Sequence, residues 1–180
     1  VKQGSIAVRV LGSLSVILIC CVLLGACSQQ TLVLEPASVA AGRMLVDRSQ
    51  YEEAEAHFES LLDSARSAND ELLTATCLKW LGNIELVYRR EDVALDYYQQ
   101  SLDILEELTA AGGTGTPTLA FDEKKNVQNN IGTIHTNRTE FGEAEKMFRD
   151  VLAYDRKRGE LLPIAVSLYN LGLLEYSKTI

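Results

Sequence analysis

Apolar side chains recur through most of the chain at the spacing of an amphipathic helix. Phe58, Leu61 and Leu62 fall at positions i, i+3 and i+4, which share one helix face. Tyr98 and Leu102 continue the same pattern one unit later. The pattern predicts antiparallel pairs of helices joined by short breaks, which lie near Arg48–Gln50, Arg89–Glu91 and Thr139–Glu140.

Four segments of the chain repeat the same residue types at the same offsets. A glycine recurs at Gly42, Gly82, Gly132 and Gly172, with spacings of 40, 50 and 40 residues. An alanine follows twelve residues after each of the first three glycines, at Ala54, Ala94 and Ala144. An aromatic residue follows each alanine at +4 and a leucine at +8, as in Phe58 with Leu62. Small residues are expected where two helices cross, because a larger side chain would push the helices apart.

These offsets resemble the tetratricopeptide repeat, whose signature is L-G-x-x-Y followed by an alanine and an aromatic residue. The best stretches are KWLGNIELVYRREDVALDYYQQSL and TEFGEAEKMFRDVL. The spacing of 40 is similar to the longer-helix repeats of kinesin light chains. The resemblance implies an all-α solenoid of helix-turn-helix units in a right-handed superhelix. The expected units are residues 35–74, 75–124 and 125–164, with a partial unit at 165–180.

The first residues have the pattern of an export signal. Lys2 and Arg9 precede an uncharged run of 17 residues, Val10–Ala26, which ends in small residues. Its end, Leu24-Gly25-Ala26-Cys27, resembles a bacterial lipobox. The resemblance implies a signal peptide over 1–26, a diacylglycerol on Cys27 and a short linker over 27–34. An uncleaved transmembrane anchor and an ordinary signal with a chance cysteine remain alternatives.

Two further features bear on location and partners. Ser28 follows the lipobox cysteine, where an aspartate would retain an enteric lipoprotein in the inner membrane. We therefore expect the outer membrane, with the body facing the periplasm. The chain carries a net charge of −8, and Lys2 and Arg9 are the only charges in the first 27 residues, so the body carries −10. A body of that sign is not expected to bind nucleic acid.

The residues that carry chemistry in enzymes show no catalytic pattern here. His57 and His135 have no His or Cys partner at metal-ligand spacing, and the phosphate-binding glycine motifs and the G-x-S-x-G elbow are missing from the sequence. Cys77 is expected to pack as a small apolar residue. Adjacent acids such as Glu106 and Glu107 point about 100° apart on a helix and are expected to face solvent. We expect no enzyme, no metal and no cofactor apart from the lipid on Cys27.

The family resemblance implies a peptide-binding groove lined by the first helix of each unit. The residues that fall at its groove positions are Lys79, Trp80, Asn83, Asn126, Asn130, Thr133, Tyr169 and Asn170. Asn130 and Asn170 occupy equivalent positions, which resembles the asparagine ladder of long-helix peptide-binding repeats. Amides pair with the backbone of an extended peptide, and tryptophan is enriched at binding hot spots. An incomplete carboxylate clamp that uses Lys79, and simple solvation of these polar residues, are the alternatives.

Two segments interrupt the array. Residues 111–118, AGGTGTPT, contain three glycines and a proline and are expected to form a loop. The fourth unit has a first helix near Ile164–Lys178 but no second helix, so Leu168, Leu171 and Leu174 lack a partner on one side. We expect the natural chain to continue or a partner to cover this end, because solenoids finish with a polar capping helix.

These features predict a membrane-anchored scaffold that binds an extended segment of another envelope protein and adds no chemistry of its own. The competing hypothesis makes the chain the N-terminal docking part of a larger envelope enzyme or regulator. A third hypothesis is a structural array that associates with itself. The sequence does not determine the oligomeric state.

Overall fold

The computed structural model describes residues 36–110 and 118–179. These residues form seven α-helices and no strand: α2 (Ala37–Asp47), α3 (Tyr51–Ser67), α4 (Glu71–Val87), α5 (Glu91–Ala110), α6 (Thr118–Asn137), α7 (Phe141–Arg158) and α8 (Leu161–Ser177). The predicted signal segment, Cys27 and residues 111–117 of the predicted loop lie outside the described residues. None of the described helices has the length and apolar character needed to cross a membrane.

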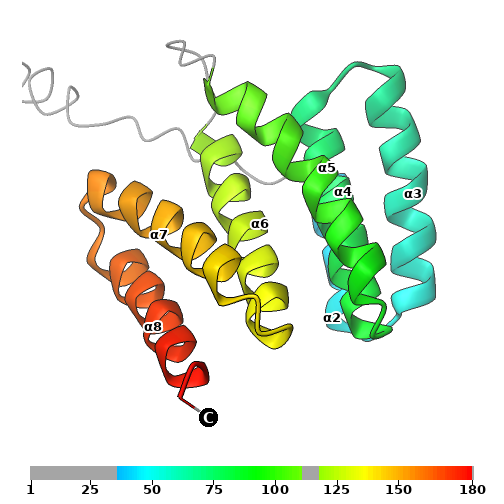
Figure 1. The fold of residues 1–180 in the computed structure, drawn as a ribbon. Coiled ribbons are helices and arrows are strands. Elements are labelled where there is room, and N and C mark those ends of the chain that lie inside the picture. The colour runs from blue at the N-terminus through cyan, green and yellow to red at the C-terminus, as the bar shows by residue number, and fades with distance from the viewer. Residues whose placement is uncertain (1–35, 111–117, 180) are drawn as a thin grey trace, which may run out of the picture. The chain divides into compact units, whose positions relative to one another are not determined.

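The helices follow one another as antiparallel neighbours, which makes an all-α helical-repeat solenoid (Figure 1). Three pairs, α2 with α3, α4 with α5 and α6 with α7, are followed by the single helix α8. We call the first helix of each pair an A helix and the second a B helix, so that α8 is a fourth A helix. The A helices also contact each other directly, α2 with α4 and α4 with α6. The breaks predicted within the three pairs are confirmed, because each pair turns over three residues.

The unit boundaries differ from those expected from the sequence. The boundaries before residues 75, 125 and 165 fall inside α4, α6 and α8 instead of in turns. At α4 and α8, local contacts before the helix account for the earlier start. At α4, the Asp70 carboxylate accepts a hydrogen bond from the Leu73 backbone N–H at 3.0 Å. At α8, Gly159 ends the preceding helix in the left-handed conformation, with φ of 75°.

The turns that follow α2, α3, α4 and α6 share one backbone geometry. In the first of them Ser49 is left-handed, with φ of 60°, and the Gln50 N–H donates to the Leu45 carbonyl at 2.9 Å. The same bond closes the others, for example from Glu140 to His135 at 2.9 Å. These bonds satisfy carbonyls at the helix end that have no partner within the helix. Each turn therefore reverses the chain in the same way, and the pairs repeat.

Within each of the three pairs, an aromatic ring of the B helix lies directly against the glycine of the A helix. A Cβ added to Gly82 would lie 2.7 Å from the Tyr98 ring, and one added to Gly132 would lie 2.7 Å from the Phe148 ring. Gly42 meets the Phe58 ring in the same way. These positions therefore require glycine because the ring occupies the space of a side chain.

Gly172 on α8 differs from the other three repeat glycines. A Cβ added there would meet nothing within 4 Å. The reason is that the described residues place no B helix against this side of α8. The same repeat position is therefore closely packed three times and open once.

This contrast predicts opposite effects for one substitution. Gly132→Ala is expected to lower the free energy of unfolding by about 1–3 kcal/mol, because the new methyl group overlaps the Phe148 ring. Gly172→Ala is expected to raise it by about 1 kcal/mol, because alanine is the better helix former and meets no neighbour. Urea unfolding of both variants in dilute solution measures this. Two changes of the same sign would contradict the packing described for Gly132 and Gly172.

Candidate partner-binding face

The groove residues predicted from the sequence all lie on the A helices α4, α6 and α8. We call the side of the array that carries them the A-helix face. The structure divides the predicted residues into two groups, those engaged in contacts within the fold and those that are exposed. The first group contains Lys79, Trp80, Asn83, Asn130 and Asn170, and the second contains Asn126, Thr133 and Tyr169.

Asparagine side chains link α4 to α6 and α6 to α8. The Asn130 Nδ2 donates to Asn83 Oδ1 at 3.0 Å and so connects α6 to α4. The Asn170 Nδ2 donates to Asn129 Oδ1 at 3.2 Å and connects α8 to α6. The Tyr98 hydroxyl from α5 also donates to Asn83 Oδ1, at 2.7 Å. Burial raises the pKa of this hydroxyl, so it stays a donor at neutral pH. The equivalent residues Asn130 and Asn170 therefore stabilise the stacking of the A helices.

Lys79 makes an ion pair within the fold, so its ammonium is not available to bind a ligand. Its ammonium lies 2.6 Å from the Glu123 carboxylate of α6, and only 7% of Lys79 is exposed. A buried lysine beside a carboxylate has its charge already compensated. The carboxylate clamp that the sequence offered as an alternative needs this ammonium for a peptide terminus. The pairing with Glu123 therefore argues against the clamp.

Trp80 is packed against neighbouring side chains of the array, whereas a side chain that anchors a ligand would be exposed. Its ring stacks on Phe58 with centroids 5.6 Å apart and the two planes 5° from parallel. The Lys79 ammonium lies 4.8 Å from the centre of the same ring. Trp80 is half-buried, and these two contacts use much of its surface. Its principal role in the structure is to join α3 to α4.

The exposed part of the predicted set is centred on α6. Asn126 and Thr133 lie seven residues apart and therefore on one side of this helix, and both are exposed. Thr133 donates its hydroxyl to the Asn129 carbonyl at 2.9 Å, which leaves its oxygen lone pairs directed outward. On α8, Tyr169 is 64% exposed. The accessible polar groups on this side are thus amides, which donate and accept hydrogen bonds, and the Thr133 hydroxyl oxygen, which accepts them.

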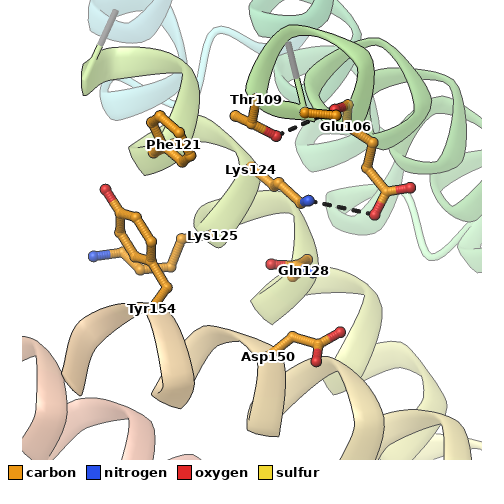
Figure 2. A pocket seen from close by; sticks show the side chains of 9 residues that line it. Glu106, Thr109, Phe121, Lys124, Lys125, Gln128, Asp150 and Tyr154 are labelled. Carbon is orange, nitrogen blue, oxygen red and sulfur yellow. Dashed lines mark hydrogen bonds and ion pairs between the residues drawn. The ribbon is translucent and has the colours of Figure 1, made fainter. Parts of the chain in front are cut away.

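A cavity lies elsewhere, between α5, α6 and α7 (Figure 2). It has a volume of about 460 Å³. Phe121 and Tyr154 stack on one side with ring centroids 5.5 Å apart. Lys124 reaches across toward Glu106, with their charged atoms 3.5 Å apart, and Gln128 lies between them and Asp150. Because its two lysines face two acids, the cavity has no charge preference of its own.

No motif or spacing in the chain predicts this cavity or the partner of Lys79. The cavity draws its residues from three helices, and Glu123 lies on a different repeat from Lys79. Both depend on how one pair stacks on the next. A periodic pattern within a pair contains no information on that contact.

The residues with potential reactivity are used in packing. Burial raises the pKa of the Cys77 thiol to about 12, so it remains protonated and unreactive at neutral pH. His57 shares a hydrogen bond of 2.8 Å with the Ser38 carbonyl and joins α3 to α2. His135 pairs with Glu140 across the turn that follows α6. Among the described residues, no three histidine, cysteine or acidic side chains are grouped as metal ligands would be.

The Lys79–Glu123 pair yields a test of whether Lys79 stabilises the fold. Lys79→Met is expected to lower the free energy of unfolding by about 3 kcal/mol, because it leaves the Glu123 carboxylate without its cation. Adding Glu123→Leu is expected to recover most of that loss. Urea unfolding of the single and double variants measures both. If Lys79→Met left the stability unchanged, Lys79 would not stabilise the fold and would again be a candidate for binding a ligand.

The comparisons with known proteins point to one family. Two family models, each described as a tetratricopeptide repeat, match residues 35–107 and 126–158. The first match covers α2 to α5 except the last residues of α5, and the second covers most of α6 and all of α7. A search of curated proteins found none that matches this chain.

Proposed function

The chain belongs to the tetratricopeptide repeat family of protein–protein interaction scaffolds, and on that premise we propose that its A-helix face binds an extended segment of another protein. Proteins of this family are typically non-catalytic. The bound segment would lie across α4, α6 and α8. The observation that carries the proposal is the run of exposed, uncharged polar groups on α6.

Hydrogen-bonding capacity supports an extended backbone as the ligand. Such a backbone offers N–H and C=O groups at regular intervals, and an amide side chain can pair with either. Asn126 is exposed, and Asn130 still has its Oδ1 and one N–H after its bond to Asn83. These groups have no net charge, so the peptide need not be acidic or basic. Tyr169 at the edge of this face adds an exposed aromatic ring.

Site-specific photo-crosslinking in the cell of origin tests this face. A photoreactive residue at Asn126 is expected to capture a protein partner, because the side chain is exposed beside the amide row. The matched control places the same group at Gln100, which is also exposed but lies on the B helix α5. Thr133→Trp is expected to reduce capture from Asn126 by about tenfold by filling the face. Equal capture from Asn126 and Gln100 would refute a specific peptide face.

We further propose that the scaffold is held at a membrane by lipid on Cys27. The support is the sequence alone: two basic residues, an apolar run and a lipobox-like end at Leu24–Cys27. Two or more acyl chains hold a protein firmly at a bilayer, whereas one chain holds it weakly. Ser28 after the cysteine favours the outer membrane, with the array in the periplasm.

The intact mass of the protein isolated from its native membrane tests the anchor. We expect a chain that begins at Cys27 and carries acyl groups, and Cys27→Ser is expected to release the array from the membrane fraction. A mass that retains residues 1–26 would instead indicate a transmembrane anchor. A mass larger by whole kilodaltons would favour the competing hypothesis of a larger enzyme or regulator.

A further inference from the structure

Helix α8 exposes an apolar face on the side where the other A helices carry a B helix. Leu161 is 84% exposed, Leu162 is 76% exposed, and Tyr169 and Tyr176 are 64% exposed each. Most of the exposed large apolar side chains among the described residues lie on this one helix. Its contact with α7 is made on the opposite side, through Leu174 and its neighbours. The open position of Gly172 lies on the exposed side.

The three complete pairs show what occupies such a face. In each, the B helix presents an alanine, an aromatic residue four positions later and a leucine at +8, as in Ala94, Tyr98 and Leu102. The aromatic ring fills the space at the glycine. The expected occupant of the α8 face is therefore a helix with a small residue, a ring and a leucine at these spacings.

Helix α8 itself contains this pattern. Ala165, Tyr169 and Leu173 have the spacing of the B helices, and all three are exposed. At 100° per residue, Ala165, Tyr169, Gly172 and Tyr176 fall within about 60° of one another on the helix surface. One face of α8 therefore carries both parts of the contact: the small, aromatic and leucine residues of a B helix, and a glycine with open space beside it. A surface that carries both complementary parts can pair with itself about a twofold axis.

We propose that the α8 face binds the α8 face of a second copy of this chain, in antiparallel orientation. Ala165 of each copy would lie opposite Gly172 of the other, and each Tyr169 ring would fill the space at the other copy's Gly172. Aromatic side chains in helices lean toward the N-terminus, which brings the Tyr169 ring to the level of Ala165 and so to the opposing glycine. The arrangement repeats between two chains the contact that Tyr98 and Gly82 make within one.

Charge does not oppose this pairing. Glu175 is the only charged residue of α8, and the Lys178 ammonium holds its carboxylate at 2.7 Å. The polar contact of α8 lies on its buried side, where the Ser167 hydroxyl donates to the Asp155 carboxylate of α7 at 2.6 Å. The face offered to a second copy is therefore apolar, with two tyrosine hydroxyls to reach solvent at its rim. Asn126 and Thr133 on α6 remain outside it, and Tyr169 is the residue that it shares with the edge of the peptide-binding face.

Photo-crosslinking of the full chain tests the proposed dimer directly. With Tyr169→benzoylphenylalanine, we expect a product of twice the chain mass whose crosslink maps near Gly172 of the second copy. The control, Val93→benzoylphenylalanine, places the probe at an exposed apolar position on α5 and is expected to give no such product. No product from position 169, or one that maps to another helix or to another protein alone, would overturn the proposal.

A second variant separates packing at Gly172 from any general loss of fold. Gly172→Leu is expected to lower the dimer crosslink from position 169 by about tenfold or more, because the leucine fills the space meant for the opposing ring. It is expected to leave the thermal unfolding curve of the chain intact, because nothing lies within 4 Å of the new Cβ. Ala56→Leu places a leucine at an exposed site on α3 and is expected to leave the dimer unchanged. Undiminished crosslinking in Gly172→Leu would overturn the assigned geometry.

Discussion

The contact between a glycine on the A helix and an aromatic ring on the B helix is the constraint on which the array depends. In the described residues it occurs at Gly42, Gly82 and Gly132, and each ring lies where a Cβ would be. The ring is buried because the two helices approach closely there, and they approach closely because glycine has no side chain. The three-residue turns deliver each B helix to this contact with the same geometry.

A second set of contacts joins the later units of the array to one another, and it is polar. Lys79 pairs with Glu123, Asn130 bonds to Asn83, and Ser167 bonds to the buried Asp155. Buried polar groups need such partners, and a partner on the next repeat fixes how the repeats stack. The same groups are then no longer free for a ligand. The proposed binding on the A-helix face therefore rests on the positions that stacking leaves open, chiefly Asn126 and Thr133 on α6.

Helix α8 shows what happens when the glycine contact is not made. It has the sequence of an A helix and packs against α7, yet its Gly172 faces open space. The apolar side chains around that glycine are exposed for the same reason. Tyr169 lies where this open face meets the A-helix face, so one residue borders both surfaces.

Much of the architecture follows from the sequence alone. Helical periodicity predicts the helices, the recurring glycine, alanine and aromatic residues predict their pairing, and the breaks between paired helices are where the pattern places them. These features are local, because each involves residues close together in the chain or within one pair. The starts of α4 and α8 were less predictable, because the Asp70 cap and the left-handed Gly159 decide them.

The tertiary structure decided which of the predicted site residues are accessible. Lys79, Asn129 and Tyr169 occupy the same repeat position, yet Lys79 is 7% exposed, Asn129 is half-buried and Tyr169 is 64% exposed. The difference arises from the neighbouring repeat: Glu123 of α6 covers Lys79, Asn170 of α8 bonds to Asn129, and no described helix follows α8. The position of a residue within the repeat determines which way its side chain points from its own helix. Whether that side chain is buried depends on the A helix of the next repeat. Contacts between repeats join residues that are far apart in the sequence, so the pattern within one repeat does not predict them.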